Sequence, residues 1–99
     1  MIYEHAVMSV IPGQEAAFEA ALAEALEVIG TAAGGTARVL RSVEAPSTYV
    51  LLVEWDSVEA HTEGFRGSEA FARWRALVSP HWSELPEVQH LTPIAERRP

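Results

Sequence analysis

The chemistry open to this sequence depends first on four polar side chains, Tyr3, His5, Arg41 and His61. His61 lies in the first turns of a predicted helical region that follows a strand ending at Trp55. Histidine titrates near neutral pH, so His61 could act as a general base or hydrogen-bond donor at the mouth of a pocket. The alternative is a solvated or packing histidine with no chemical role.

Tyr3 and His5 lie two residues apart in a predicted strand, so their side chains share one face of it. If that face is turned toward the helices, both residues enter a pocket. If it is turned toward a partner subunit, both belong to an interface. The strand period leaves both alternatives open, because both faces of the sheet are expected to be covered.

Arg41 is expected in a strand, on the same face as Val39 and Val43. A cation among apolar neighbours could stabilise an enolate or a phenolate. A salt bridge to Glu44, Glu54 or another carboxylate is the alternative interpretation.

The aromatic residues indicate a hydrophobic core and a pocket wall. Aromatic side chains at helical spacing are usually part of a core, which is the interpretation for Phe71 and Trp74. Trp55, Phe65 and Trp82 are the candidates for a flat pocket that binds a small aromatic ligand.

Composition excludes several classes of function. The chain has no cysteine, and no two histidines have a metal-ligand spacing, so we expect neither a metal nor a cofactor. A net charge of −7 disfavours nucleic-acid binding. No apolar run approaches the roughly 20 residues that span a membrane, and the N-terminal residues do not resemble a signal peptide. A cytoplasmic protein is therefore expected.

Hydrophobic periodicity predicts six elements in the order β-α-β-β-α-β. Strands are expected at 2–11, 36–44, 48–55 and 87–94, the last at a sheet edge. An apolar stripe from Phe18 to Ile29 predicts the first helix, which ends before Gly34. The second helical region starts at Ser57, restarts at Ser68 after glycine interruptions, and ends at Pro80. This order predicts one ferredoxin-like α+β domain of residues 1–99 with an antiparallel sheet.

The run from Tyr49 to Val53 is continuously apolar. Such a strand is usually covered on both faces. Two helices on one side of a sheet cannot do that, so the sequence predicts a homodimer formed through the sheet.

The segment Trp55-Asp56-Ser57-Val58-Glu59-Ala60-His61, followed by Gly64-Phe65-Arg66, Ser68 and Phe71, resembles the central signature of antibiotic biosynthesis monooxygenase (ABM) proteins. The resemblance implies that two ferredoxin-like protomers pack sheet against sheet into a dimeric α/β barrel. It also implies a pocket in each protomer between its sheet and its helices. Members of this family include cofactor-independent oxygenases of aromatic polyketides or quinols, and heme-degrading enzymes.

The expected function is therefore a cofactor-independent monooxygenase acting on a small quinol- or polyketide-like aromatic. His61 or His5 would be the base and Tyr3 or Arg41 the donor to the anion. The alternatives are a non-enzymatic small-molecule-binding dimer and a dimeric-barrel cyclase or isomerase. Heme degradation is disfavoured. The resembling heme-degrading enzymes use an asparagine, a tryptophan and a histidine. This chain has no asparagine, and it has Phe65 near the position of the tryptophan and Arg75 near the position of the histidine.

Overall fold

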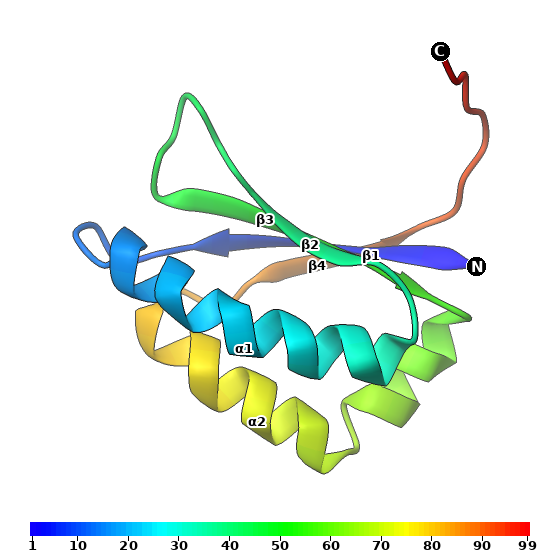
Figure 1. Cartoon of the computed structure of the whole chain (residues 1–99), viewed down its shortest axis with the longest axis horizontal. Coiled ribbons are helices and arrows are strands. Elements are labelled where there is room, and N and C mark those ends of the chain that lie inside the picture. The colour runs from blue at the N-terminus through cyan, green and yellow to red at the C-terminus, as the bar shows by residue number, and fades with distance from the viewer.

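Two helices cover one face of a four-stranded antiparallel sheet in the computed structural model, which describes residues 1–99 (Figure 1). The strands run in the spatial order β2-β3-β1-β4, which is the ferredoxin-like arrangement predicted from the sequence. The elements are β1 (Ile2–Ser9), α1 (Glu15–Ala33), β2 (Ala37–Arg41), β3 (Thr48–Trp55), the π-helical turn η1 (Ala60–Phe65), α2 (Glu69–Val78), the 3₁₀ turn η2 (Ser79–His81) and β4 (Glu87–Leu91). No helix of the chain is both long and apolar enough to cross a membrane.

Strict alternation along β1 and β3 decides which side chains face the helices. In β1 the buried residues are Glu4, Ala6 and Met8. In β3 every second residue from Tyr49 to Trp55 is buried. The two strands pair in register, Glu4 opposite Val53 and Ala6 opposite Leu51. Together with residues of α1 and α2, these side chains form one hydrophobic core between sheet and helices.

Local sequence signals explain where the helices begin and end. Gly34 ends α1 in the left-handed conformation with φ of 70°, which a residue with a Cβ atom adopts at a cost. The Ser68 hydroxyl caps the start of α2 by accepting from the Phe71 amide. The Ser57 hydroxyl likewise accepts from the Ala60 amide ahead of η1. Both serines therefore act at the helix starts predicted for them.

Three strands are shorter than the hydrophobic pattern predicts. β1 ends at Ser9 because Val10 pairs singly with Trp82 and the Ile11 amide donates to the carbonyl of His81. β2 ends at Arg41, where the chain enters the turn to β3. β4 ends at Leu91, two residues before Pro93, which has no amide hydrogen to offer a strand. In each case at least one apolar residue follows the strand end, namely Val10, Val43 or Ile94, so hydrophobicity alone extended the predicted strand.

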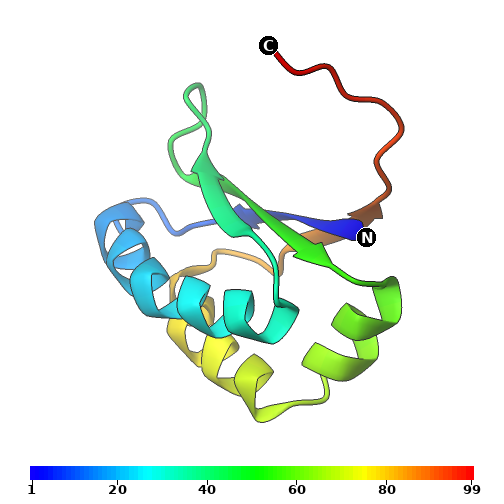
Figure 2. The same cartoon turned by 45° about the vertical axis from the view of Figure 1, so that its right-hand side comes forward.

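The other face of the sheet has no cover within the chain. It carries Tyr3, His5 and Val7 of β1 opposite Glu54, Leu52 and Val50 of β3. Figure 2 shows both helices on one side, whereas the β2–β3 hairpin and the C-terminal segment extend on the other. These two extensions carry Val43 and Ile94, which are 86% and 89% exposed. The chain therefore leaves one sheet face uncovered, with apolar Val7, Val50 and Leu52 among polar side chains and two exposed apolar side chains beside it.

Candidate functional site

A cavity of about 280 Å³ lies between the sheet and the helical layer. Its wall is mostly apolar and aromatic, with four ionisable side chains among its residues. The residues that line it are Glu4, Ala6, Ile29, His61, Phe65, Arg66, Phe71, Trp74, Arg75, Trp82, Leu85, Pro86 and Val88. Small-molecule sites commonly combine such an apolar enclosure with a few polar groups.

Glu4 and His61 are the only buried charged or polar residues of the chain, at 3% and 2% exposure. The indole nitrogen of Trp55 donates to Oε1 of Glu4 at 3.1 Å. Nε2 of His61 lies 3.3 Å from the same oxygen. Nδ1 of His61 is hydrogen-bonded to Nε2 of His90 at 2.8 Å. These contacts form one continuous chain of groups, which we name the Glu4–His61–His90 network.

Each member of the network is positioned by a different element. Glu4 faces the helices from the central strand β1, and His90 is its partner in register on the edge strand β4. His61 comes from η1 and is held between aromatic rings. The ring of Trp55 stacks on His61 with centroids 5.0 Å apart and planes inclined by 22°, and Phe65 lies 6.3 Å away. This packing fixes the imidazole between the carboxyl group and the sheet edge.

Burial shifts the ionisation of both central groups toward their neutral forms. Desolvation raises the pKa of Glu4, against smaller opposing effects of the Trp55 hydrogen bond and the Arg66 charge. Desolvation, with smaller contributions from the charges of Arg66 and His90, lowers the pKa of His61 to about 4. His61 is therefore neutral at neutral pH. The 3.3 Å contact has the distance of an ion pair but is a contact of a carboxyl group with an uncharged imidazole.

The second oxygen of Glu4 is the polar group that the network leaves free. Both contacts of the carboxyl group are to Oε1, and Oε2 has no hydrogen-bond partner in the protein. Oε2 is not fully enclosed, since Trp82 Nε1 is the only fully enclosed polar side-chain atom without a partner, and Glu4 lines the cavity. A carboxyl oxygen with a raised proton affinity is thus available to a ligand in an apolar cavity.

The histidine and two aromatic residues predicted for a site do come together. His61, Phe65 and Trp82 all line the cavity. Trp55 does not line the cavity, but its indole nitrogen donates to Glu4 and its ring stacks on His61, so it orients both. The indole nitrogen of Trp82 is enclosed and has no hydrogen-bond partner. Phe71 and Trp74, predicted as core, also line the cavity.

The other three predicted residues lie elsewhere. Tyr3 and His5 are on the uncovered face of the sheet, opposite Glu54 and Leu52. Arg41 is partly exposed, pairs with Glu19 at 3.1 Å, and donates to the Pro46 carbonyl at 2.7 Å. None of the three lines the cavity.

Sequence reasoning did not single out Glu4 or His90 as site residues. A usable signal existed for Glu4, because it occupies the same strand face as Ala6 and Met8, where a carboxyl group interrupts an apolar series. His90 follows from it, since the two residues are paired across the sheet. The facing of β1, which the sequence leaves open, was the missing information.

The fold and the site together define the class of protein. It is a ferredoxin-like α+β protein whose aromatic-lined cavity lies between sheet and helices and contains a buried acid–histidine pair. The family model described as "Antibiotic biosynthesis monooxygenase" (ABM) matches residues 1–77, and the chain belongs to this family.

Similar proteins cover nearly the whole chain. A Bordetella bronchiseptica protein of known structure, described as of the same monooxygenase type, is 40% identical, with a TM-score of 0.90 over 95% of this chain and 97% of its own. The Bacillus subtilis protein YczJ, called uncharacterized, is 36% identical over 95 residues, which are 95% of this chain and all of YczJ. A Nitrosomonas europaea structure, 17% identical with a TM-score of 0.78 over 96% of this chain and all of its own, shares the fold.

Proposed function

We propose that this protein is a cofactor-independent monooxygenase of a small quinol- or polyketide-like aromatic substrate. Membership of the family suggests monooxygenase-like chemistry. The observation that carries the proposal is the Glu4–His61–His90 network in the wall of an apolar, aromatic cavity. Such a site offers what direct reaction with oxygen requires, namely a base, a water-poor enclosure and flat walls for an aromatic ring.

Glu4 is the proposed base. Its Oε2 takes the proton of a phenolic O–H or an activated C–H group, and the electron pair stays on the substrate as a phenolate or carbanion. The anion passes one electron to dioxygen, and recombination of the two radicals forms a C–O bond. Return of the proton gives a hydroperoxide, which loses water and leaves a carbonyl group. One oxygen atom enters the product and the other leaves as water.

His61 and His90 are proposed to connect Glu4 with solvent. When Glu4 is protonated between turnovers, a proton on Oε1 passes to Nε2 of neutral His61, 3.3 Å away, as the proton on Nδ1 moves to Nε2 of His90, 2.8 Å away, and Glu4 becomes a carboxylate again. His90 is half-buried on the edge strand β4, so it can exchange its proton with water. The lowered pKa of His61 supports this role, because the imidazole then relays a proton without storing it.

We also propose that the protein is a homodimer formed through the sheet. The uncovered face carries apolar Val7, Val50 and Leu52 in its two central strands. Neighbouring apolar side chains left uncovered in the central strands of a sheet are typical of an interface. Val43 and Ile94, on the two extensions beside that face, would also become buried against a partner (Figure 2). Tyr3 and His5 would then be interface residues.

Oxygen consumption tests the catalytic proposal. The purified protein is mixed with substituted hydroquinones and with anthrone, and uptake is followed with an oxygen electrode. Glu4→Gln is expected to lower turnover about 100-fold or more, the usual contribution of a general base, while ligand binding persists. Glu63→Gln is the matched control, since Glu63 lies on η1 outside the cavity wall and should keep full turnover. Equal turnover in both variants would exclude Glu4 as the base.

A non-enzymatic ligand-binding protein is the second candidate. One observation favours it: both nitrogens of His61 and one oxygen of Glu4 already have partners within the protein, as in a structural polar cluster. In that case an aromatic would bind in the cavity, oxygen uptake would be absent, and Glu4→Gln would change only affinity. The oxygen-electrode experiment therefore separates the two candidates.

A further inference from the structure

Two arginines, Arg66 and Arg75, lie at the cavity on different elements. Arg66 follows η1, and Arg75 lies in the last turn of α2. We propose that the ligand of this cavity is an aromatic acid, a flat one- or two-ring body whose carboxylate is bound by Arg66 and Arg75. The inference rests on the proposed function in that it names the substrate class of the same cavity.

The distribution of charge supports an anionic ligand. The chain has 14 acidic residues against seven arginines, so carboxylate partners are abundant. Arg41, Arg73 and Arg98 each have a carboxylate within 4 Å. Arg66 and Arg75 have none, although both line a cavity that is otherwise mostly apolar. Arg38 and Arg97 also lack a carboxylate partner, so an unpaired exposed arginine is ordinary by itself. Arg66 and Arg75 differ because both line one mostly apolar cavity, where their guanidinium groups offer donors to a planar anion.

The positive charge also acts inside the cavity. The charge of Arg66 contributes to lowering the pKa of His61 and partly opposes the rise that burial causes in the pKa of Glu4, so its field reaches the buried pair. A bound carboxylate would compensate that charge at the mouth.

The size and walls of the cavity limit the rest of the ligand. A volume of about 280 Å³ lies at the small end of known ligand sites and suits one or two rings. Phe71, Trp74 and Trp82 provide apolar and aromatic surface on the helix side. An aromatic acid could place its ring among these side chains, its hydroxyl group near Glu4 and its carboxylate toward the arginines.

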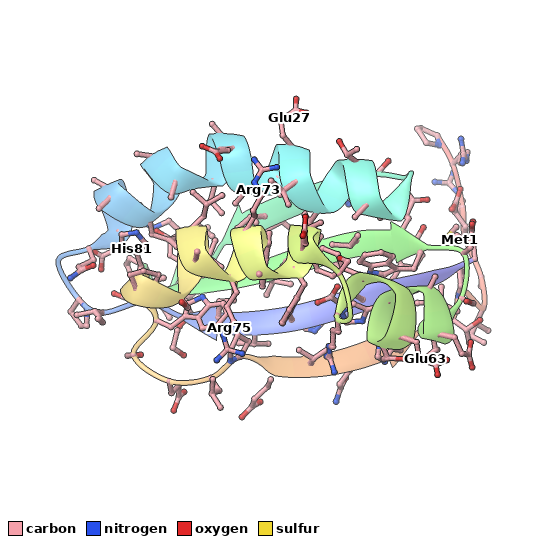
Figure 3. All side chains as sticks on the ribbon, turned by 90° about the horizontal axis from the view of Figure 1, so that it is seen from below. Met1, Glu27, Glu63, Arg73, Arg75 and His81 are labelled. Carbon is pink, nitrogen blue, oxygen red and sulfur yellow. The ribbon has the colours of Figure 1, made fainter.

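The helix α2 supplies a matched control. Arg73 extends toward α1, where it pairs with Glu24 at 3.3 Å. Figure 3 shows Arg75 on the opposite side of the same helix, extending toward the chain that leads into β4. The two arginines are exposed, belong to one helix and differ in whether they line the cavity. Their replacement should therefore change net charge equally and ligand binding unequally.

Binding is measured without oxygen, so that turnover does not interfere. The probes are 2,5-dihydroxybenzoate and neutral hydroquinone, titrated by calorimetry and tryptophan fluorescence. We expect the acid to bind about tenfold more tightly than hydroquinone, and Arg75→Gln and Arg66→Gln each to weaken the acid about tenfold while hydroquinone is unaffected. Arg73→Gln should leave both affinities unchanged. Thermal unfolding of each variant checks that the fold is intact.

Three results would overturn the inference: no binding of the acid to the unsubstituted protein, equal affinity for both probes, or equal effects of Arg73→Gln and Arg75→Gln. Its failure is distinguishable from that of the proposed function. Oxygen uptake with neutral quinols and no preference for the acid would sustain the monooxygenase and reject the aromatic acid. Arginine-dependent binding of the acid without oxygen uptake would do the reverse.

Discussion

The protonation of His61 makes a quantitative prediction about stability. In the folded protein its pKa is about 4, whereas an exposed histidine in the unfolded chain has its ordinary value of 6.5. Above that ordinary value His61 is neutral in both states. As the pH falls below it, the unfolded chain binds a proton that the folded chain does not, so stability is lost until the pH reaches about 4. The difference in pKa corresponds to about 3 kcal/mol.

Glu4 acts in the opposite direction. Its pKa is raised by burial, so the folded protein holds a proton at pH values where the unfolded chain has lost it. The contribution of Glu4 therefore becomes more favourable as the pH falls toward its ordinary pKa of 4.5. The unsubstituted protein shows the sum of the two effects, and single variants separate them.

The assay is urea unfolding at fixed protein concentration between about pH 7 and about pH 4.5, a range that avoids most carboxylate titration. A fixed concentration matters because dissociation of a dimer contributes to the measured stability. The free energy of unfolding of Glu4→Gln should fall by about 2 kcal/mol as the pH is lowered over this range, because the effect of His61 is then not opposed by Glu4. His61→Gln should not show this loss of unfolding free energy, because the titrating imidazole is absent. Val78→Ala, a core variant without a titratable group, should lower stability equally at every pH.

Identical pH dependence in the unsubstituted protein and in His61→Gln would refute the reasoning. A direct check is the titration of the His61 ring signals by NMR. If His61 in the folded protein titrates near its ordinary value, burial does not control its charge. The proposed relay through a neutral imidazole would then lose its support.

Three other predictions concern backbone, network and assembly. Gly34→Ala should cost about 1 kcal/mol in urea unfolding, because φ is 70° there, whereas Gly30→Ala should gain up to about 1 kcal/mol, because its added Cβ meets only the Ala37 side chain at 3.8 Å. Trp55→Phe removes the donor to Glu4, so stability should fall by about 1–2 kcal/mol and the acidic limb of a pH–rate profile should move to higher pH. Leu52→Glu should yield monomers in analytical ultracentrifugation, and a persisting dimer would exclude the sheet face as the interface.

The sequence predicted the fold well because each signal was local. The apolar stripe of α1, the serine caps at Ser57 and Ser68, and the period of two in the strands each report on a few neighbouring residues. Strand ends were predicted less well, because backbone pairing stops where the neighbouring strand turns away. Val10 shows this: it is buried like a strand residue, yet it forms only an isolated bridge with Trp82 from beyond α2, and its amide donates to the Ser47 carbonyl in the turn before β3.

The site was harder to predict because it depends on which face of β1 meets the helices. The sequence shows that Tyr3 and His5 share a face but not which layer covers it. A shift of one residue exchanges the two faces, so His5 and Glu4 are alternatives for the same cavity. The structure places Glu4 inside and His5 outside. His61 and Phe65 do lie on the cavity wall, because a helical turn after a strand offers fewer alternative orientations than a strand covered on both faces; their functional role stays a prediction.

The buried pair has a cost that helps to explain its place in the molecule. Taking a charged carboxylate or imidazolium out of water is unfavourable, which is why burial raises the pKa of Glu4 and lowers the pKa of His61. Apolar side chains of similar volume often stabilise a fold more than buried polar partners do. The hydrophobic core surrounds this pair with Ala6, Met8 and Trp55. The pair lines the cavity, beside the arginines and the aromatic wall, where a group with raised proton affinity can act on a ligand.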